Sequence, residues 1–269
     1  MKRTEREWRL VREEAWEGPT NMALDEVAAA TAAAGGPRTV RVYRWEPSTL
    51  SLGYHQDSHT VDWEFCEREG ISVTRRPTGG GGIYHDLHGD ISYTIVAPAD
   101  ELPGNLMESY ELLCEPILAA FDRLGVEAGF AEEPQPEIHR PACYLRELHP
   151  AHDVVAGGKK ISGNAQYRRK DAVIQHGSVT FESLPERHLS TFSNPETTPE
   201  EFSDRVTSLR EQGVEDREAA VEAFEGALKE WAGAEEGSWS DEELQDARER
   251  ADGKFASEAW NRDGDDPLD

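Results

Sequence analysis

The stretch RRPTGGGGIYHD, residues 75–86, places charge beside backbone that carries no side chains. Consecutive glycines can turn several N–H groups toward one point and let a ligand approach without meeting a Cβ atom. Arg75 and Arg76 add guanidinium groups, which suit a carboxylate or a phosphate. The stretch therefore predicts an anion-binding loop formed by the two arginines with Gly79, Gly80, Gly81 and Gly82. A flexible connection or a bulged hairpin would use glycine in the same way.

This loop differs from the common nucleotide-binding loops, since no Lys-Ser or Lys-Thr pair follows the glycines and no helix opens directly from them. His85 and Asp86 come next in the chain. They could line the same site, or they could be a polar pair at a strand start held by a structural hydrogen bond.

Lys159 and Lys160 are adjacent in a chain that contains only six lysines. Lysine carries a compact charge on a flexible stem, which can follow an oxygen atom through a reaction. We interpret one of the two as a reacting group, and two solvated turn lysines are the alternative. A turn lysine contributes little to stability, so Lys160→Ala is expected to abolish activity and leave the fold intact.

The three cysteines, Cys66, Cys114 and Cys143, are an odd number without metal-type spacing. This argues against a disulfide framework and favours a reducing compartment. The histidine pairs, His85 with His88 and His149 with His152, have no third ligand beside them, so no metal site is predicted from a protein cluster.

The elements that must position these residues follow from apolar spacing. A helix is expected from Thr20 or Asn21 to Gly35, and strands at 39–45, 49–54, 71–77, 90–98 and 172–181, so that the glycine loop joins two strands. An apolar stripe from Leu106 to Leu124 predicts a second helix that ends at Gly125. Residues 153–169 predict a hairpin whose turn is Gly157 and Gly158.

After Asn194 the chain becomes a series of acidic helices. Capping boxes are expected at Thr198–Glu201 and Ser240–Glu243, each followed by an apolar stripe. Residues 195–269 hold 24 acidic and 8 basic residues. We therefore divide the chain into a domain at 1–194 and an acidic helical C-terminal extension at 195–269 packed on it.

Composition limits the partners. The formal net charge is -26, so a nucleic-acid backbone would be repelled, and no apolar run suggests a membrane segment. We expect a cytoplasmic protein. Abundant acid with little lysine is the composition expected of a halophilic protein, in which dense salt screens self-repulsion; an ordinary acidic protein is the alternative.

The residues also carry a family resemblance. RRPTGGGGIYHD with GDISYTIVAP, and then GGKKISGNAQ, resemble the signature segments of the lipoate protein ligases, within the superfamily of biotin and lipoate ligases and octanoyl transferases. NMALDE, VRVYRWEPSTLSLGYHQ and KFASEAWN support this in order and spacing. The resemblance implies an α+β catalytic domain at 1–194, with a mixed, largely antiparallel sheet and flanking helices.

It also implies a two-step reaction. Lipoate (or octanoate) and ATP, with Mg²⁺, would form an acyl adenylate, and a lysine of a lipoyl-domain protein would then displace AMP. The acceptor would be a 2-oxoacid dehydrogenase E2 subunit or a glycine-cleavage H protein. By this resemblance Lys160 would contact the acyl carbonyl and the α-phosphate, while the substrate and ATP would be bound by Arg75, Arg76, Gly79, Gly80, Gly81, Gly82, His85, Ser162 and Gly163.

Two departures leave alternatives open. The chain stops soon after KFASEAWN, where larger ligases carry an accessory domain, so a separate small accessory protein could be required. PACYLRE resembles instead the octanoyl transferases in which a cysteine, here Cys143, takes an octanoyl group from acyl carrier protein without ATP. Cys143 packed as a small hydrophobe, and a noncatalytic acyl-binding regulator, are the further alternatives.

Overall fold

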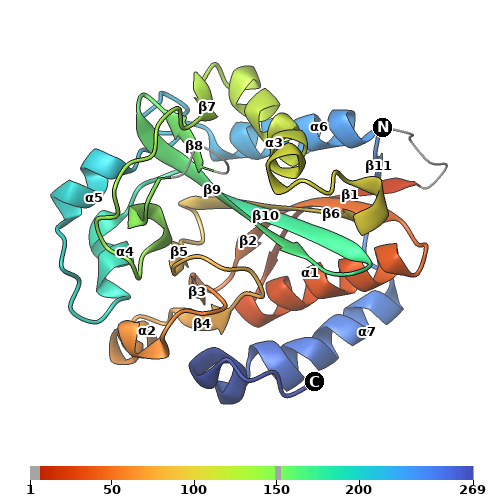
Figure 1. Cartoon of the computed structure of the whole chain (residues 1–269), viewed down its shortest axis with the longest axis horizontal. Helices are drawn as coiled ribbons and strands as arrows, with labels where there is room; N and C mark the ends of the chain where they lie inside the picture. Colours follow the sequence, from red (N-terminus) through yellow and green to blue (C-terminus); the bar gives the residue numbers. More distant parts are fainter. Residues whose placement is uncertain (1–6, 149–152, 269) are drawn as a thin grey trace.

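An eight-stranded mixed sheet forms the centre of the fold (Figure 1). The computed structural model describes residues 7–148 and 153–268. The strand order is β11-β1-β2-β6-β10-β9-β8-β7, in which β1 pairs in parallel with β2 and β11 and the other neighbours are antiparallel. The strands are β1 Trp8–Trp16, β2 Arg38–Trp45, β6 Asp90–Pro98, β7 Ala128–Phe130, β8 Asp153–Ala156, β9 Lys159–Arg168, β10 Ala172–Thr180 and β11 Glu235–Glu236. The mixed, largely antiparallel sheet implied by the family resemblance is confirmed.

Helices cover both faces of this sheet, and α1 lies on one face with α7 outside it (Figure 1). On the other face α3 and α6 pack together, and their Phe121 and Phe224 rings meet edge to face at 5.4 Å. The helices are α1 Gly18–Ala33, α2 Trp63–Arg68, α3 Leu106–Arg123, α4 Pro185–Ser190, α5 Pro199–Arg205, α6 Arg217–Ala232 and α7 Asp241–Arg250. The two helices expected near 20–35 and 106–124 are therefore confirmed, although Leu106, the first residue of α3, is exposed and not part of the buried stripe.

A second, three-stranded sheet has the order β4-β3-β5, with bounds Ser72–Arg75, Thr49–Leu52 and Ile83–His85. The glycine loop joins β4 to β5, as predicted. Leu50 and Ile83 of this sheet share a hydrophobic cluster with Phe192 and with Phe202 of α5. The small sheet thus has its own packing partners, which hold the glycine loop against the edge of the larger structure.

Residues 195–269 contribute to the central packing. Phe224 and Leu228 of α6 share one hydrophobic cluster with Leu10 and Val40 of the sheet, and β11 lies at the edge of that sheet. The predicted capping boxes at Thr198 and Ser240 are both present. Each hydroxyl accepts a bond from the N–H three residues later, and the glutamate carboxylate at that position accepts one from the N–H of the capping residue.

Candidate active site

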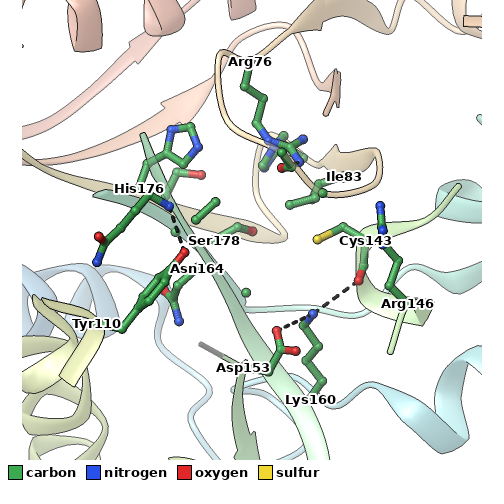
Figure 2. Close-up of a pocket in the computed structure, with 18 of the residues that line it drawn as sticks. Arg76, Ile83, Tyr110, Cys143, Arg146, Asp153, Lys160, Asn164, His176 and Ser178 are labelled. Atoms are coloured by element: carbon green, nitrogen blue, oxygen red, sulfur yellow. Dashed lines mark hydrogen bonds and ion pairs between the residues drawn. The ribbon is translucent and has the colours of Figure 1, made fainter. Parts of the chain in front are cut away.

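A cavity of about 420 Å³ lies between the central sheet and the glycine loop. Strands β2, β6, β9 and β10, the loop, β5 and the short 3₁₀ turn Cys143–Leu145 all contribute to its walls. Figure 2 shows Cys143, Lys160, Asp153, Arg76 and His176 around this space. Residues far apart in the sequence therefore meet at one point.

Lys160 is a buried charge. Its ammonium nitrogen lies 2.7 Å from Asp153 Oδ1 and 3.3 Å from the carbonyl oxygen of Cys143, and the residue is 3% exposed (Figure 2). Burial would lower the pKa of this ammonium, but Asp153 and Cys143 oppose it, and the pKa of Lys160 is raised. The interpretation as a solvated turn lysine is therefore wrong for Lys160, whereas Lys159 is half-buried and donates to Ser203 O.

A β-bulge aims Lys160 into the cavity. The register of β8 against β9 shifts between Val154 and Val155, which face Ser162 and Lys160, so Ile161 is an extra residue on β9. Residues three apart on a regular strand face opposite sides, yet Lys160 and Gly163 both line the cavity. A Cβ atom on Gly163 would lie 3.6 Å from Lys160 Nζ and 4.0 Å from Cys143 Sγ. The ammonium of Lys160 and the sulfur of Cys143 thus both lie beside Gly163.

Cys143 is held by the glycine loop. Its N–H donates to Gly82 O at 2.8 Å, and Gly82 N–H donates to Pro141 O at 2.6 Å. The side chain is partly exposed and its Sγ lies in the cavity (Figure 2). Cys66 and Cys114 are buried elsewhere, and burial raises the pKa of each thiol to about 12. Of the three cysteines, Cys143 is the one placed to act as a nucleophile.

The glycine loop bends around Arg76. Gly80 has a φ of 105°, which glycine adopts without strain, and a Cβ atom on Gly53 would clash with its carbonyl oxygen. Arg76 Nη2 donates to Gly79 O at 3.1 Å and to Gly81 O at 2.8 Å. Within residues 7–148 and 153–268 the N–H groups of Gly79, Gly80 and Gly81 have no hydrogen-bond partner. The carbonyls of Gly79 and Gly81 are therefore bound by Arg76, while the amides of Gly79, Gly80 and Gly81 are available to a ligand.

Known proteins resemble this chain in sequence and in fold. A family model described as the lipoyl protein ligase A/B catalytic domain matches residues 17–232. The octanoyltransferase LipM of Kyrpidia tusciae is 32% identical over 94% of this chain and 98% of its own length. A crystal structure of lipoate-protein ligase A bound with ATP superposes with a TM-score of 0.79 at 25% identity, covering 95% of this chain and 98% of that one.

The chain belongs to the lipoyl protein ligase A/B family. It is an enzyme of the group that transfers lipoyl or octanoyl groups, as the resemblance of its motifs implied. The putative lipoate protein ligase of T. acidophilum with bound lipoic acid has the same fold, with a TM-score of 0.78, 25% identity and coverage of 96% and 99%. The family model continues across residue 194, where the sequence suggested a boundary.

Only some of the predicted ligand-binding residues line the cavity. Arg76, Gly79, Gly80, His85 and Gly163 line it with Lys160 and Cys143. Gly81 and Gly82 pack against the Pro141–Cys143 segment and Phe192, while Ser162 is fully buried. Asp86 accepts bonds from His88 N, Gly89 N and Tyr84 OH, so it shapes the turn before β6.

Arg75 lies outside the cavity lining. Its guanidinium donates to five backbone carbonyls, those of Gly53, Tyr54, Gln56, Trp260 and Asn261. Because adjacent residues of a strand point to opposite faces, Arg75 faces the C-terminal segment and Arg76 faces the site. Arg75 therefore joins the end of the chain to the strand that leads into the glycine loop.

The lining residues that the sequence did not predict include Asp153, Asn164 and His176. Asp153 opens the predicted hairpin, but its meeting with Lys160 depends on the bulge, which has no clear sequence signal. His176 stands in a predicted strand, and an imidazole inside a strand of the central sheet was the available signal.

Within residues 7–148 and 153–268, no group of three or more His, Cys, Asp or Glu side chains could hold a metal ion. His149 and His152, considered above as a pair, lie outside the described residues. No helix in the described part of the chain is long and apolar enough to span a membrane.

Proposed function

We propose that the protein is a cysteine-dependent octanoyl transferase, which moves an octanoyl group from a carrier thioester to a lysine of a lipoyl-domain protein. One observation carries the proposal: Cys143 Sγ and Lys160 Nζ both lie within 4.0 Å of the position that a Cβ atom on Gly163 would take. A nucleophilic sulfur and a buried ammonium thus share one small space. The LipM name of the relatives supports the same choice.

In the first step the Cys143 thiolate attacks the carbonyl carbon of the carrier thioester. A C–S bond to Cys143 forms, the C–S bond to the carrier breaks, and the carrier thiolate leaves and takes up the proton that Cys143 released. The product is an octanoyl thioester on Cys143. No phosphate is consumed, because the donor is already activated.

In the second step the neutral ε-amine of the acceptor lysine attacks this thioester. A C–N bond forms, the C–S bond to Cys143 breaks, and the proton lost by the amine balances the charge of the released thiolate. Lys160 stabilises the Cys143 thiolate before the first step and again when the second step releases it. The amides of Gly79, Gly80 and Gly81 can donate to the carbonyl oxygen as it becomes negative.

An ATP-dependent lipoate ligase is the second candidate. The likeness to lipoate-protein ligase A bound with ATP favours it, as do the unpartnered N–H groups of the glycine loop. Against it stands Arg76, whose N–H groups already donate to Ser51, Thr78, Gly79 and Gly81, and Arg75, which lies outside the cavity lining. Neither guanidinium is free to bind a phosphate in this arrangement. Mg²⁺ belongs to this second reaction only, where it would accompany ATP.

The experiment compares two donors. The protein is incubated with octanoyl-loaded acyl carrier protein without ATP, or with free octanoate or lipoate, ATP and Mg²⁺, and the tryptic peptide that contains Cys143 is examined by mass spectrometry. We expect a hydroxylamine-labile octanoyl group on this peptide from the carrier alone, followed by transfer to a lipoyl domain. Cys143→Ser should lose both products.

Transfer that needs ATP and free acid, and that survives Cys143→Ser, would overturn this proposal in favour of the ligase. The acceptor is tested in parallel with an E2 lipoyl domain and a glycine-cleavage H protein, each with its target lysine replaced as a control.

A further inference from the structure

Arg76 is a buried cation that contacts only neutral groups. It is 4% exposed, and its guanidinium donates to Ser51 O at 2.6 Å, Ser51 Oγ at 3.0 Å, Thr78 Oγ1 at 3.3 Å and the two loop carbonyls. No carboxylate among the described residues forms an ion pair with it. Lys160, by contrast, is paired with Asp153. Among the described residues, Arg76 is therefore a buried cation beside the cavity that has no carboxylate partner.

Each of the two hydroxyls that Arg76 contacts begins a chain of hydrogen bonds. Ser51 Oγ lies 2.8 Å from His85 Nε2, and His85 Nδ1 lies 3.0 Å from Asp90 Oδ2. Thr78 Oγ1 lies 2.7 Å from His176 Nε2, and His176 Nδ1 lies 3.3 Å from Asp25 Oδ2. Two hydroxyl–imidazole–carboxylate relays thus end on one guanidinium.

The direction of these bonds follows from the number of protons. Each hydroxyl accepts an N–H from Arg76, so its own proton is free for the imidazole. A neutral imidazole that accepts at Nε2 carries its proton on Nδ1, which then donates to the carboxylate. Neither hydroxyl lines the cavity, so neither is placed as a nucleophile, although both imidazoles line it. In each relay, the hydroxyl oxygen is therefore the atom that accepts a hydrogen bond from Arg76.

Arg76 is also close to the sulfur. A Cβ atom on Gly80 would lie 3.0 Å from Arg76 Nη2 and 3.9 Å from Cys143 Sγ. Burial lowers the pKa of Arg76, and the charge of Cys143 opposes that effect. The guanidinium and the thiol therefore face each other across the glycine loop.

We propose that the relays Ser51–His85–Asp90 and Thr78–His176–Asp25 are positioning elements that hold Arg76 against the glycine loop, so that its guanidinium stabilises negative charge on Cys143. This gives the arginine of the glycine motif a role in a reaction that uses no phosphate. The inference rests on Cys143 being the nucleophile of the proposed function.

Other ionisable groups also face Cys143. They are Tyr110 of α3, Tyr144 and Arg146 beside the cysteine, Glu147, Asp153 of β8 and Lys160 of β9. A test must therefore change the relay and leave this set intact. Thr78→Val does so, because valine has the shape of threonine and residue 78 lies outside the cavity lining.

The test measures the alkylation of Cys143 by iodoacetamide from about pH 5 to about pH 10, read on the tryptic peptide. Thr74→Val is the matched control, since Thr74 is equally buried and its hydroxyl donates to Phe255 O without touching a relay. We expect Thr78→Val to be alkylated about threefold more slowly near pH 7, as its alkylation midpoint moves up by about half a pH unit. Thr74→Val should match the parent.

An equal midpoint in Thr78→Val and Thr74→Val would overturn the proposal. A second measurement needs no variant: ¹⁵N NMR of the parent protein should show His85 and His176 protonated on Nδ1, and a proton on Nε2 of both would overturn it equally. Alkylation uses no acyl donor. A parent that is not acylated by the carrier therefore contradicts the proposed function, while the alkylation midpoints still decide the role of Arg76.

Discussion

Gly163→Ala should stop acyl transfer without unfolding the protein. The added Cβ atom would lie 3.4 Å from Lys160 Cε, 3.6 Å from Lys160 Nζ and 4.0 Å from Cys143 Sγ. These are ordinary contact distances, and Gly163 has no positive φ, so the strand can accept the methyl group. The methyl group fills the space between sulfur and ammonium, however, which the carbonyl carbon of the acyl group must enter.

The expected loss follows from misplacement of the reacting atoms. A shift of about 1 Å at the reacting centre costs about a hundredfold in rate, which corresponds to about 2.7 kcal/mol of transition-state stabilisation. Stability should change little or rise by about 0.4–1 kcal/mol, because alanine restricts the unfolded chain. Single-turnover acylation of Cys143 and urea unfolding measure the two quantities separately.

Gly129→Ala is the matched control, since Gly129 lies on β7 and a Cβ atom there would meet nothing within 4 Å. It should retain full transfer activity. If Gly163→Ala is acylated within about twofold of the parent rate, the space between Cys143 and Lys160 is not where the acyl carbon sits. The proposed geometry of attack would then be wrong.

Four further predictions concern stability. Lys160→Ala should lower the free energy of unfolding by about 3–5 kcal/mol, because it removes the cation that forms an ion pair with the buried Asp153. Adding Asp153→Asn to this variant should restore most of that free energy but no transfer, as measured by urea unfolding and acylation. Since the pKa of Lys160 in the folded protein is raised above its ordinary value of 10.5, its stabilisation is complete below pH 10.5 and is lost as the pH rises through the folded value. Unfolding curves of Asp153→Asn should lack this alkaline loss. Thr198→Ala should cost about 1 kcal/mol in the same assay, because it removes the hydroxyl that caps α5. Because the net charge is -26, the temperature of half-unfolding should rise when the KCl concentration is raised from about 0.1 M to about 1 M, as the screening length falls from about 10 Å to about 3 Å. An unchanged temperature would contradict the halophilic interpretation.

Periodic segments were predictable from the sequence. The stripe Tyr110, Leu113, Ile117 and Phe121 gave α3, and the glycine pair gave the β8–β9 hairpin, since both signals are local. The strand β1 was missed, because WRLVREEAW carries charges among its apolar residues and alternates poorly. Its arginine and glutamate side chains find partners far along the chain: Arg9 with Glu243, and Glu13 with Arg217. Such long-range pairing leaves no local pattern.

Some features of the site were likewise predictable from local sequence, and others depend on tertiary structure. The glycine loop and the lysine pair could be found from residue type and spacing. The burial of Lys160 could not, since it depends on one extra residue in β9 and on an ion pair with Asp153, which lies opposite Gly163 in the strand register. Bulges are set by tertiary packing, here by Ile161 entering the hydrophobic core. The charge state of a site is therefore less predictable than its residue list.

The different environments of Arg75 and Arg76 could have been predicted from the alternation of side chains along a strand. Arg75 ends β4, and a strand alternates its side chains, so one arginine had to face the cavity and the other had to face away. The one that faces away is bound by carbonyls of Trp260 and Asn261, and Trp260 Nε1 returns a bond to Arg75 O. The KFASEAWN segment, residues 254–261, thus holds β4 in place, and β4 leads into Arg76 and the glycine loop. The role of this segment is structural, because it supports the strand before the glycine loop and contributes no residue to the cavity lining.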